Sequence, residues 1–123
     1  MNAIVQPRLR RKVSKIINTD VINSVVSYNF GCTEQMLFEK SRRPEHVEPR
    51  QVTILLYILL LAMSETIAAR QYMQNHATAN HAKYNVRRLY SIDKHYRLKI
   101  DSIFRTLARN EAELRKLYSY IQA

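Results

Sequence analysis

The stretch Gln74 to Ala82, QNHATANHA, combines amide side chains, two histidines and one threonine with small residues. It opens a helical pattern that extends to about Tyr90. Apolar residues recur in this pattern at the spacing of one helical face, and they are Ala79, Ala82, Val86 and Leu89. The stretch therefore predicts an amphipathic helix whose first turn is polar and unbulky.

The opposite face of this predicted helix carries Ala77, His81, Tyr84 and Arg88, and its later turns add Lys83 and Arg87. Small side chains let a helix approach a surface closely, amides can read base edges, and cations can meet phosphates. A solvated helix with a Gln/Asn-rich start has the same pattern. The stretch alone therefore leaves both interpretations open.

The composition indicates a single all-α domain. The chain has 123 residues, of which 46% are hydrophobic, and this suffices for one modest core. One glycine and three prolines suit helices joined by short turns and argue against a β-sandwich or a Rossmann sheet. Because no stretch resembles a glycine-rich phosphate loop, we expect neither a nucleotide nor another cofactor.

Positive charge is high and unevenly distributed. The formal net charge is +10, and residues 51–69 contain no lysine or arginine. Clustered cations are typical of a protein that binds a polyanion, although an ordinary solvated basic surface remains the alternative. The clusters are Arg8, Arg10, Arg11, Lys12 and Lys15; Lys40, Arg42, Arg43 and Arg50; and Arg70, Lys83, Arg87, Arg88, Lys94, Arg97 and Lys99.

Neither the cysteine content nor the apolar segments point to secretion or a membrane. Cys32 is the single cysteine, so we expect no disulfide or cysteine zinc site and place Cys32 in the core. The N-terminal charges are not followed by the long apolar region of a secretory signal. Val52 to Met63 is apolar through twelve residues, whereas a membrane span needs about 20. We therefore expect a cytoplasmic protein that uses this segment as a buried central helix.

Residues 1–18 are predicted to form a separate basic segment. Pro7 to Asn18 can form a helix, with Leu9, Val13, Ile16 and Ile17 at helical spacing. Its charges either keep a terminal helix soluble or belong to a loose arm that contacts DNA.

The helical domain is predicted over residues 19–123. Its first helix would be capped by Thr19 or Asp20 and would end at Gly31, the only glycine, in the left-handed conformation. Thr33 would then cap a short helix, TEQMLFE. The positions expected to face inward are Val21, Ile22, Val25, Val26, Tyr28, Met36, Leu37 and Phe38.

Lys40 to Val47, KSRRPEHV, is predicted to be a basic loop in which Pro44 prevents a regular helix. Glu48 and Pro49 would open the next helix, with proline in its first turn. Arg50 would then lie at a helix start, where the macrodipole disfavours a cation. That placement indicates either an external phosphate or a salt bridge to nearby Glu45 or Glu48.

A helix-turn-helix is predicted over about residues 64–90. Ser64 would cap the short helix SETIAARQ, with Ile67 and Ala68 inward, and a tight turn at Tyr72–Met73 would lead into the helix that starts near Asn75.

The C-terminal segment would start at Ser91 or Asp93 and break near Asn110. It either completes the bundle or makes a homodimer contact. Its apolar face comprises Tyr96, Ile100, Ile103, Phe104, Leu107, Leu114, Leu117, Tyr118 and Ile121.

From about Val21 to Leu107 the chain resembles the C-terminal DNA-binding domain of the bacterial replication initiator DnaA, a fold related to the Trp repressor. VVSYNFGCTEQMLFEKSRR resembles the family's opening helix, tyrosine–glycine turn and short helix before a basic loop. EPRQV resembles the start of the family's next helix, and Ile67–Ala68 stand where the family has Ile-Gly. QNHATANHA is similar to the family signature Arg-Asp-His-Ser/Thr-Thr-Val-x-His-Ala and matches it at His76, Thr78, His81 and Ala82.

The resemblance implies a multi-helix bundle with an embedded helix-turn-helix that binds double-stranded DNA at specific sequences, in a regulatory or replication-associated role at the nucleoid. The helix starting near Asn75 would read the major groove, and the basic loop would grip the backbone. The residues expected to contact DNA are Arg42, Arg43, Arg50, Gln74, Asn75, His76, Ala77, Thr78, His81, Lys83 and Arg87, with Lys40 in support.

The chain departs from the family at several positions. Asn75 replaces an aspartate and Ala77 replaces a hydroxyl residue, so the preferred DNA sequence should differ. Tyr72–Met73 replaces Gly-Gly, so the turn must take another backbone path. Because 123 residues cannot also hold the family's ATPase domain, we expect a DNA-binding relative that lacks it.

Two other function classes remain to be compared. A helical module could bind protein through its Leu/Tyr-rich tail, with the positive charge incidental. A metal enzyme using His76 and His81 is disfavoured, because a spacing of five suits one helical face poorly and no carboxylate completes a ligand set. We therefore expect no catalytic or metal site.

Overall fold

The computed structural model describes residues 15–74 and 76–122, with the backbone alone at position 76. Every regular element within these ranges is an α-helix, which confirms the all-α class. The helices are α2 (Thr19–Phe30), α3 (Glu34–Leu37), α4 (Pro44–Leu61), α5 (Glu65–Arg70), α6 (His76–Ile92), α7 (Lys94–Leu107) and α8 (Glu111–Gln122).

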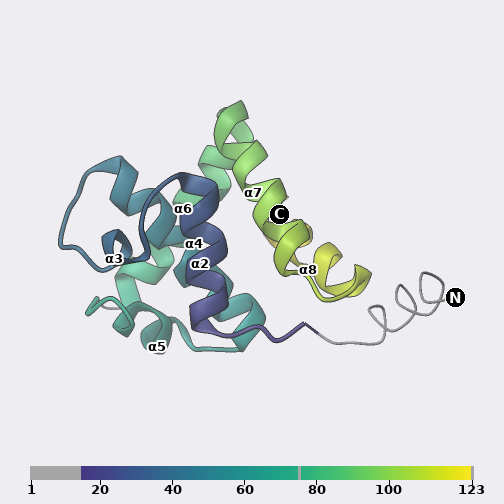
Figure 1. The fold of residues 1–123 in the computed structure, drawn as a ribbon, viewed down its shortest axis with the longest axis horizontal. Coiled ribbons are helices and arrows are strands. Elements are labelled where there is room, and N and C mark those ends of the chain that lie inside the picture. The colour runs from purple at the N-terminus through teal and green to yellow at the C-terminus, as the bar shows by residue number, and fades with distance from the viewer. Residues whose placement is uncertain (1–14, 75, 123) are drawn as a thin grey trace, which may run out of the picture.

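Helix α4 is the centre of the bundle. Its residues from Pro49 to Tyr57 are all buried, as expected for a helix that is apolar nearly all round. It packs against α2, α3, α5 and α6, whereas α7 packs against α2, α6 and α8, and α8 packs against α6 and α7. Figure 1 shows α3 and α5 on one side of the central helices and the α7–α8 pair on the other. The helix ends at Leu61, before the predicted limit at Met63, because Ala62 adopts the left-handed conformation with φ 55°.

The predicted apolar stripe of α6 is confirmed. Ala79, Ala82 and Val86 are buried and Leu89 is partly buried against the same core. Alanine side chains add little bulk, so this face of α6 can pack closely on α4. The opposite face, with Ala77, His81, Tyr84 and Arg88, is exposed as predicted.

Most of the predicted helix boundaries are confirmed by side-chain caps. The side chains of Thr33, Ser64 and Asp93 each accept a backbone N–H at the start of α3, α5 and α7. Gly31 ends α2 with φ 69°. At the start of α2 the prediction is wrong, because Asn18 is the cap and its Oδ1 accepts from the Val21 amide at 2.9 Å.

Helix α4 begins four residues earlier than predicted. Pro44 stands at its first position, where a missing N–H costs nothing because no carbonyl precedes it in the helix. Pro49 therefore lies inside the helix, not at its start. The prediction that Pro44 would keep residues 40–47 out of a helix is wrong, and the loop ends at Arg43, the residue before the helix.

Three residues predicted to face inward are exposed. Tyr28 is 86% exposed because the buried face of α2 is made by Ile22, Asn23, Val26 and Ser27. Ile67 is 50% exposed because Ala68 and Ala69 form the inner side of α5. Phe38, at 53%, follows the end of α3 and lies over the ring of Tyr72.

The C-terminal helices complete the bundle. The predicted face of α7 is buried throughout, and α8 buries Leu117 and Ile121. Asp101 on α7 accepts hydrogen bonds from the hydroxyls of Tyr90 (2.8 Å) and Tyr118 (2.7 Å), which joins α6, α7 and α8. None of the helices in the described part of the chain is long and apolar enough to span a bilayer.

The predicted basic helix over Pro7 to Asn18 lies mostly outside the described residues. Residues 15–18 are described, and they are not helical. Lys15 Nζ donates to the carbonyls of Thr106 (2.9 Å) and Ala108 (3.0 Å) at the end of α7. A cation at this position satisfies carbonyls that the helix itself leaves free.

We expect the protein to lose stability as the pH rises above about 10. Burial, followed by the hydrogen bond to Asp101, raises the pKa of Tyr90 to about 12. Burial also raises the pKa values of Tyr57, Tyr72 and Tyr118. A raised pKa means that folding favours the neutral phenol. This contribution is complete below the unfolded-state pKa and disappears as the pH passes the folded-state pKa. Thermal unfolding between about pH 9 and 12 should show a falling midpoint, and a constant midpoint would contradict the burial of these hydroxyls.

Candidate nucleic-acid interface

A hollow of about 620 Å³ lies between the α3–α4 loop, the α5–α6 turn and one side of α6. It brings together residues that are far apart in the sequence. Five of the predicted DNA-contacting residues line it, and they are Arg42, Arg50, Gln74, Thr78 and His81. Lys40, predicted in support, lines it as well.

The turn before α6 contains no glycine, and Met73 takes the left-handed conformation in its place. The φ of Met73 is 57°, which costs roughly 1–2 kcal/mol for an ordinary residue. The amides of Met73 and Gln74 donate to the carbonyls of Arg70 (2.9 Å) and Ala69 (3.1 Å). The turn is therefore closed by backbone hydrogen bonds and delivers Gln74 to the edge of the hollow.

Helix α6 presents its polar face beside the hollow. His81 and Ala77 are exposed, and Thr78 is partly exposed. Asn75 lies outside the described residues, as does the side chain of His76. Their contacts with DNA therefore stay predictions. The face continues along α6 to Tyr84 and Arg88, both exposed.

Arg50 does not have the position predicted for it. It is the seventh residue of α4, it is only 5% exposed, and its guanidinium donates to backbone carbonyls of the preceding segment. Nε donates to Leu37 at 2.8 Å, Nη1 to Ser41 at 3.4 Å, and Nη2 to Glu39. Its hydrogen-bond partners are thus neither Glu45 nor Glu48 but backbone carbonyls between the last residue of α3 and Ser41. Burial lowers the pKa of Arg50, but a guanidinium stays protonated at neutral pH. The side chain anchors the α3–α4 loop from inside.

The cations of that loop point outward. Lys40, Arg42 and Arg43 are exposed. Arg43 pairs with Glu45 at 3.7 Å, but both side chains are largely exposed, and such a pair contributes little. The loop therefore combines a fixed backbone, held by Arg50, with cations that remain accessible to a ligand.

Lys83 and Arg87 lie on the other flank of α6, away from the hollow. Both pack on Tyr120 of α8, with Lys83 Nζ 5.5 Å and Arg87 Cζ 4.7 Å from the ring centroid. Arg87 Nε also donates to the Tyr120 carbonyl at 2.9 Å. Tyr120 of α8 thus holds both cations near α6. Arg87 uses its Nε for this contact, so its Nη groups can still bind an anion.

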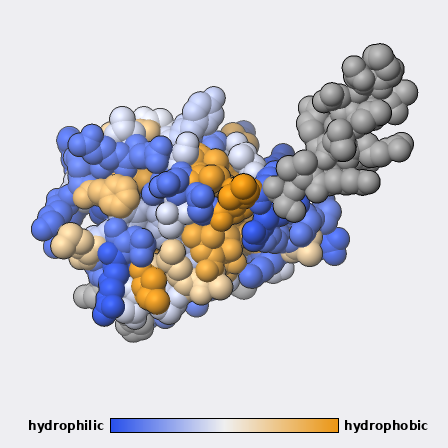
Figure 2. Space-filling model, turned by 60° about the horizontal axis from the view of Figure 1, so that its bottom comes forward, coloured by the Kyte–Doolittle hydropathy of each residue, from blue (hydrophilic) through white to orange (hydrophobic). Residues whose placement is uncertain are grey.

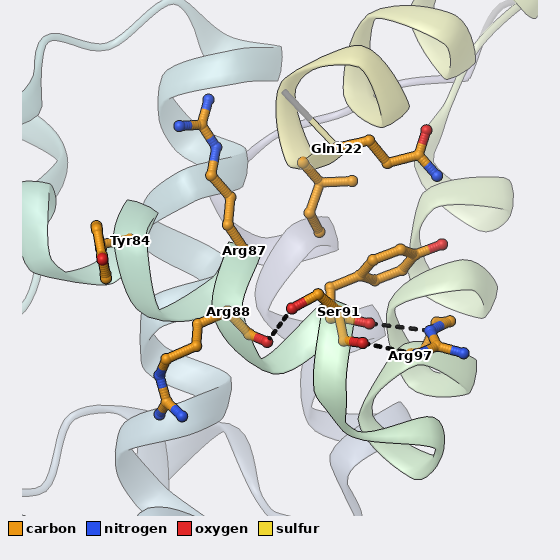
Figure 3. A pocket seen from close by; sticks show the side chains of 8 residues that line it. Tyr84, Arg87, Arg88, Ser91, Arg97 and Gln122 are labelled. Atoms are coloured by element: carbon orange, nitrogen blue, oxygen red, sulfur yellow. Dashed lines mark hydrogen bonds between the residues drawn. The ribbon is translucent and has the colours of Figure 1, made fainter.

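A second hollow, of about 640 Å³, lies between α6, α7 and α8 and is lined by Arg87, Arg88 and Arg97. Figure 3 shows Arg87 and Arg88 leaving α6 in opposite directions, so the guanidinium groups do not converge. Arg97 donates to the carbonyls of Tyr90 (2.9 Å) and Ser91 (3.1 Å), which terminates α6. Arg87 and Arg97 each join α6 to a neighbouring helix, whereas Arg88 donates to Asn85 within α6.

Sequence reasoning missed Gln51 and Asn85, which also line the first hollow. Asn85 Nδ2 donates to Gln51 Oε1 at 2.7 Å and its Oδ1 accepts from Arg88 Nη2 at 2.8 Å, which ties α6 to α4. Asn85 could have been found, because it follows Thr78 and His81 at helical spacing. Gln51 could not, because its pairing depends on how α4 and α6 meet.

The described residues contain no group of three or more His, Cys, Asp or Glu side chains placed to hold a metal ion. Figure 2 shows a surface in which hydrophilic regions border an apolar strip. Comparison of the chain with models of protein families and with curated proteins finds no match.

Proposed function

We propose that the protein binds double-stranded DNA at specific sequences, without enzymatic activity, in a regulatory or replication-associated role. In this proposal α5, the turn and α6 act as a helix-turn-helix of the kind found in the Trp repressor and in the C-terminal domain of DnaA. The N-terminal half of α6 enters the major groove, and the α3–α4 loop contacts the phosphate backbone beside it. Such a protein would associate with the nucleoid.

The observation that carries the proposal is the shared hollow. The polar face of α6, with Thr78 and His81, and the cationic loop, with Lys40 and Arg42, line the same surface feature. DNA-binding proteins commonly separate the two tasks in this way, since phosphate contacts fix the register and base contacts supply the sequence preference. The high net charge of +10 adds the long-range attraction that a polyanion requires.

The small side chain of Ala77 also supports this arrangement. It is exposed at the start of α6, where a bulky residue would hold the helix away from base edges. Alanine can contact only a thymine methyl group, while Asn75 would pair best with adenine. The proposal therefore includes a preference for A·T pairs opposite the first turn of α6.

The alternative, a module that binds protein through the tail, receives less support. The apolar positions Leu117 and Ile121 of α8 are buried inside the bundle and are not available to a partner. A homodimer through α8 would have to use the residues of that helix that remain exposed. This alternative predicts negligible affinity for any duplex at moderate salt.

Selection of random duplexes with the purified protein tests the proposal. We expect an enriched sequence, and we expect Asn75→Ala and His81→Ala each to weaken binding to it by roughly 1–3 kcal/mol, since each removes a contact to one base pair. His95→Ala is the matched control for the second variant, because His95 is also an exposed histidine but lies on α7. Absence of any enriched sequence, or an equal loss for His95→Ala, would contradict the proposal.

A further inference from the structure

Tyr72 is the centre of a polar cluster inside an otherwise apolar core. It belongs to the turn before α6 and is 8% exposed. Its hydroxyl lies 2.6 Å from Thr53 Oγ1, 2.9 Å from the Tyr57 hydroxyl and 3.3 Å from Asn23 Oδ1. One side chain of the turn thereby reaches both α2 and α4.

The hydrogen bonds of this cluster lead from Tyr72 through Thr53 to Arg50, the residue that anchors the α3–α4 loop. Thr53 Oγ1 donates its only hydrogen to the Arg50 carbonyl at 2.8 Å, so it can only accept from Tyr72. Tyr57 donates to Asn23 Oδ1. Buried hydroxyls are costly unless they are paired, so this cluster favours one arrangement of the turn over others.

The ring of Tyr72 connects the turn to the segment that leads into the basic loop. Its centroid lies 4.9 Å from that of Phe38, the residue that follows α3. The next carbonyl along the chain, that of Glu39, accepts from Arg50. Tyr72 itself lines the hollow between the loop and α6. It therefore contacts the structures on both sides of the proposed interface.

We propose that Tyr72 is a positioning residue that sets where α6 lies relative to the α3–α4 loop. It would thereby fix the distance between the side chains of α6 that contact bases and the loop cations that contact phosphates. This inference rests on the proposed function. Met73 follows in a strained left-handed conformation and is exposed, so it supplies no anchor of its own. The buried ring and hydroxyl of Tyr72 are what hold this turn against the core.

The test compares Tyr72→Phe with Tyr57→Phe. Each variant removes one hydroxyl from the same cluster and keeps the ring, but only Tyr72 belongs to the turn. We expect Tyr72→Phe to accelerate hydrogen exchange of the Met73 and Gln74 amides, beyond the change in global stability, and to weaken binding to the selected duplex roughly tenfold. Tyr57→Phe should lower stability without either selective effect.

Phe38→Ala is a second variant that keeps the proposal testable if Tyr72→Phe folds poorly, because Phe38 is half exposed. It should weaken binding to the selected duplex and leave exchange in the turn unchanged, since it removes only the contact to the loop. Equal effects of Tyr72→Phe and Tyr57→Phe on both readouts would overturn the inference. If the wild-type protein bound no duplex, the proposed function would fail, while the exchange comparison would still decide whether Tyr72 holds the turn.

Discussion

Raising the salt concentration from about 50 to 200 mM is expected to weaken binding to a selected duplex by about a thousandfold. Exposed and partly exposed cations lie on both flanks of α6, and each phosphate they neutralise releases counterions from the DNA. About six such contacts give this loss of affinity and a slope near −5 in a plot of log affinity against log salt. Fluorescence anisotropy of a labelled duplex at several salt concentrations measures the slope directly. The cations concerned are Lys40, Arg42, Arg43, Lys83, Arg87 and Arg88.

Charge removal in the loop identifies where this salt dependence originates. The double variant Arg42→Ala/Arg43→Ala should reduce the magnitude of the slope by about 2 and weaken all duplex sequences to a similar extent. Arg115→Ala is the matched control, since Arg115 is exposed on α8 and lies outside the proposed interface. An unchanged slope in the double variant, or the same change in the control, would show that the α3–α4 loop does not contact the backbone.

Replacing Arg50 by methionine is expected to lower the free energy of unfolding by about 3 kcal/mol. Methionine keeps most of the aliphatic packing but removes the charged donor to the carbonyls of Leu37, Glu39 and Ser41. Hydrogen bonds from a charged group contribute about 1.5–3 kcal/mol each, and the carbonyls left behind are partly buried. Urea unfolding measures the loss, and Arg43→Met serves as the control, because its exposed ion pair should change stability by less than about 0.5 kcal/mol.

The Arg50 variant also separates two roles for the same residue. As a loop anchor, Arg50 affects DNA affinity only through the order of the loop, so stability and affinity should fall together. Arg50→Met with wild-type stability and reduced affinity would instead mean that the guanidinium contacts phosphate. In that case the anchoring role described here would be wrong.

Local sequence signals predicted the elements of the fold well. The spacing of Ala79, Ala82 and Val86 identified the buried face of α6, because burial on a helix follows its period. The caps at Thr33 and Ser64 were equally readable, since a cap acts on amides only two or three residues away. Pro44 was misread because one residue type either starts or interrupts a helix, and the choice depends on whether a preceding carbonyl needs its N–H.

The candidate site was only partly predictable. The sequence suggested Gln74, Thr78 and His81, and the structure places them beside Arg42 on one hollow. The pattern that suggested a phosphate contact at Arg50 could not reveal that three carbonyls from the preceding segment already bind it. Charge and position along a helix are visible in a sequence, but the direction of a long side chain is not.

By itself, the sequence determined that this chain folds as a helical bundle and that the helix after residue 75 has a polar face with small side chains. These properties arise from interactions between residues a few positions apart, which periodicity and composition report. Only the tertiary structure decided that Arg50 anchors the loop and that Tyr72 joins the turn to Asn23, Thr53 and Tyr57. Those roles depend on buried donors meeting acceptors from distant segments, because a polar group removed from water must pair with whatever the packing of the helices brings within reach.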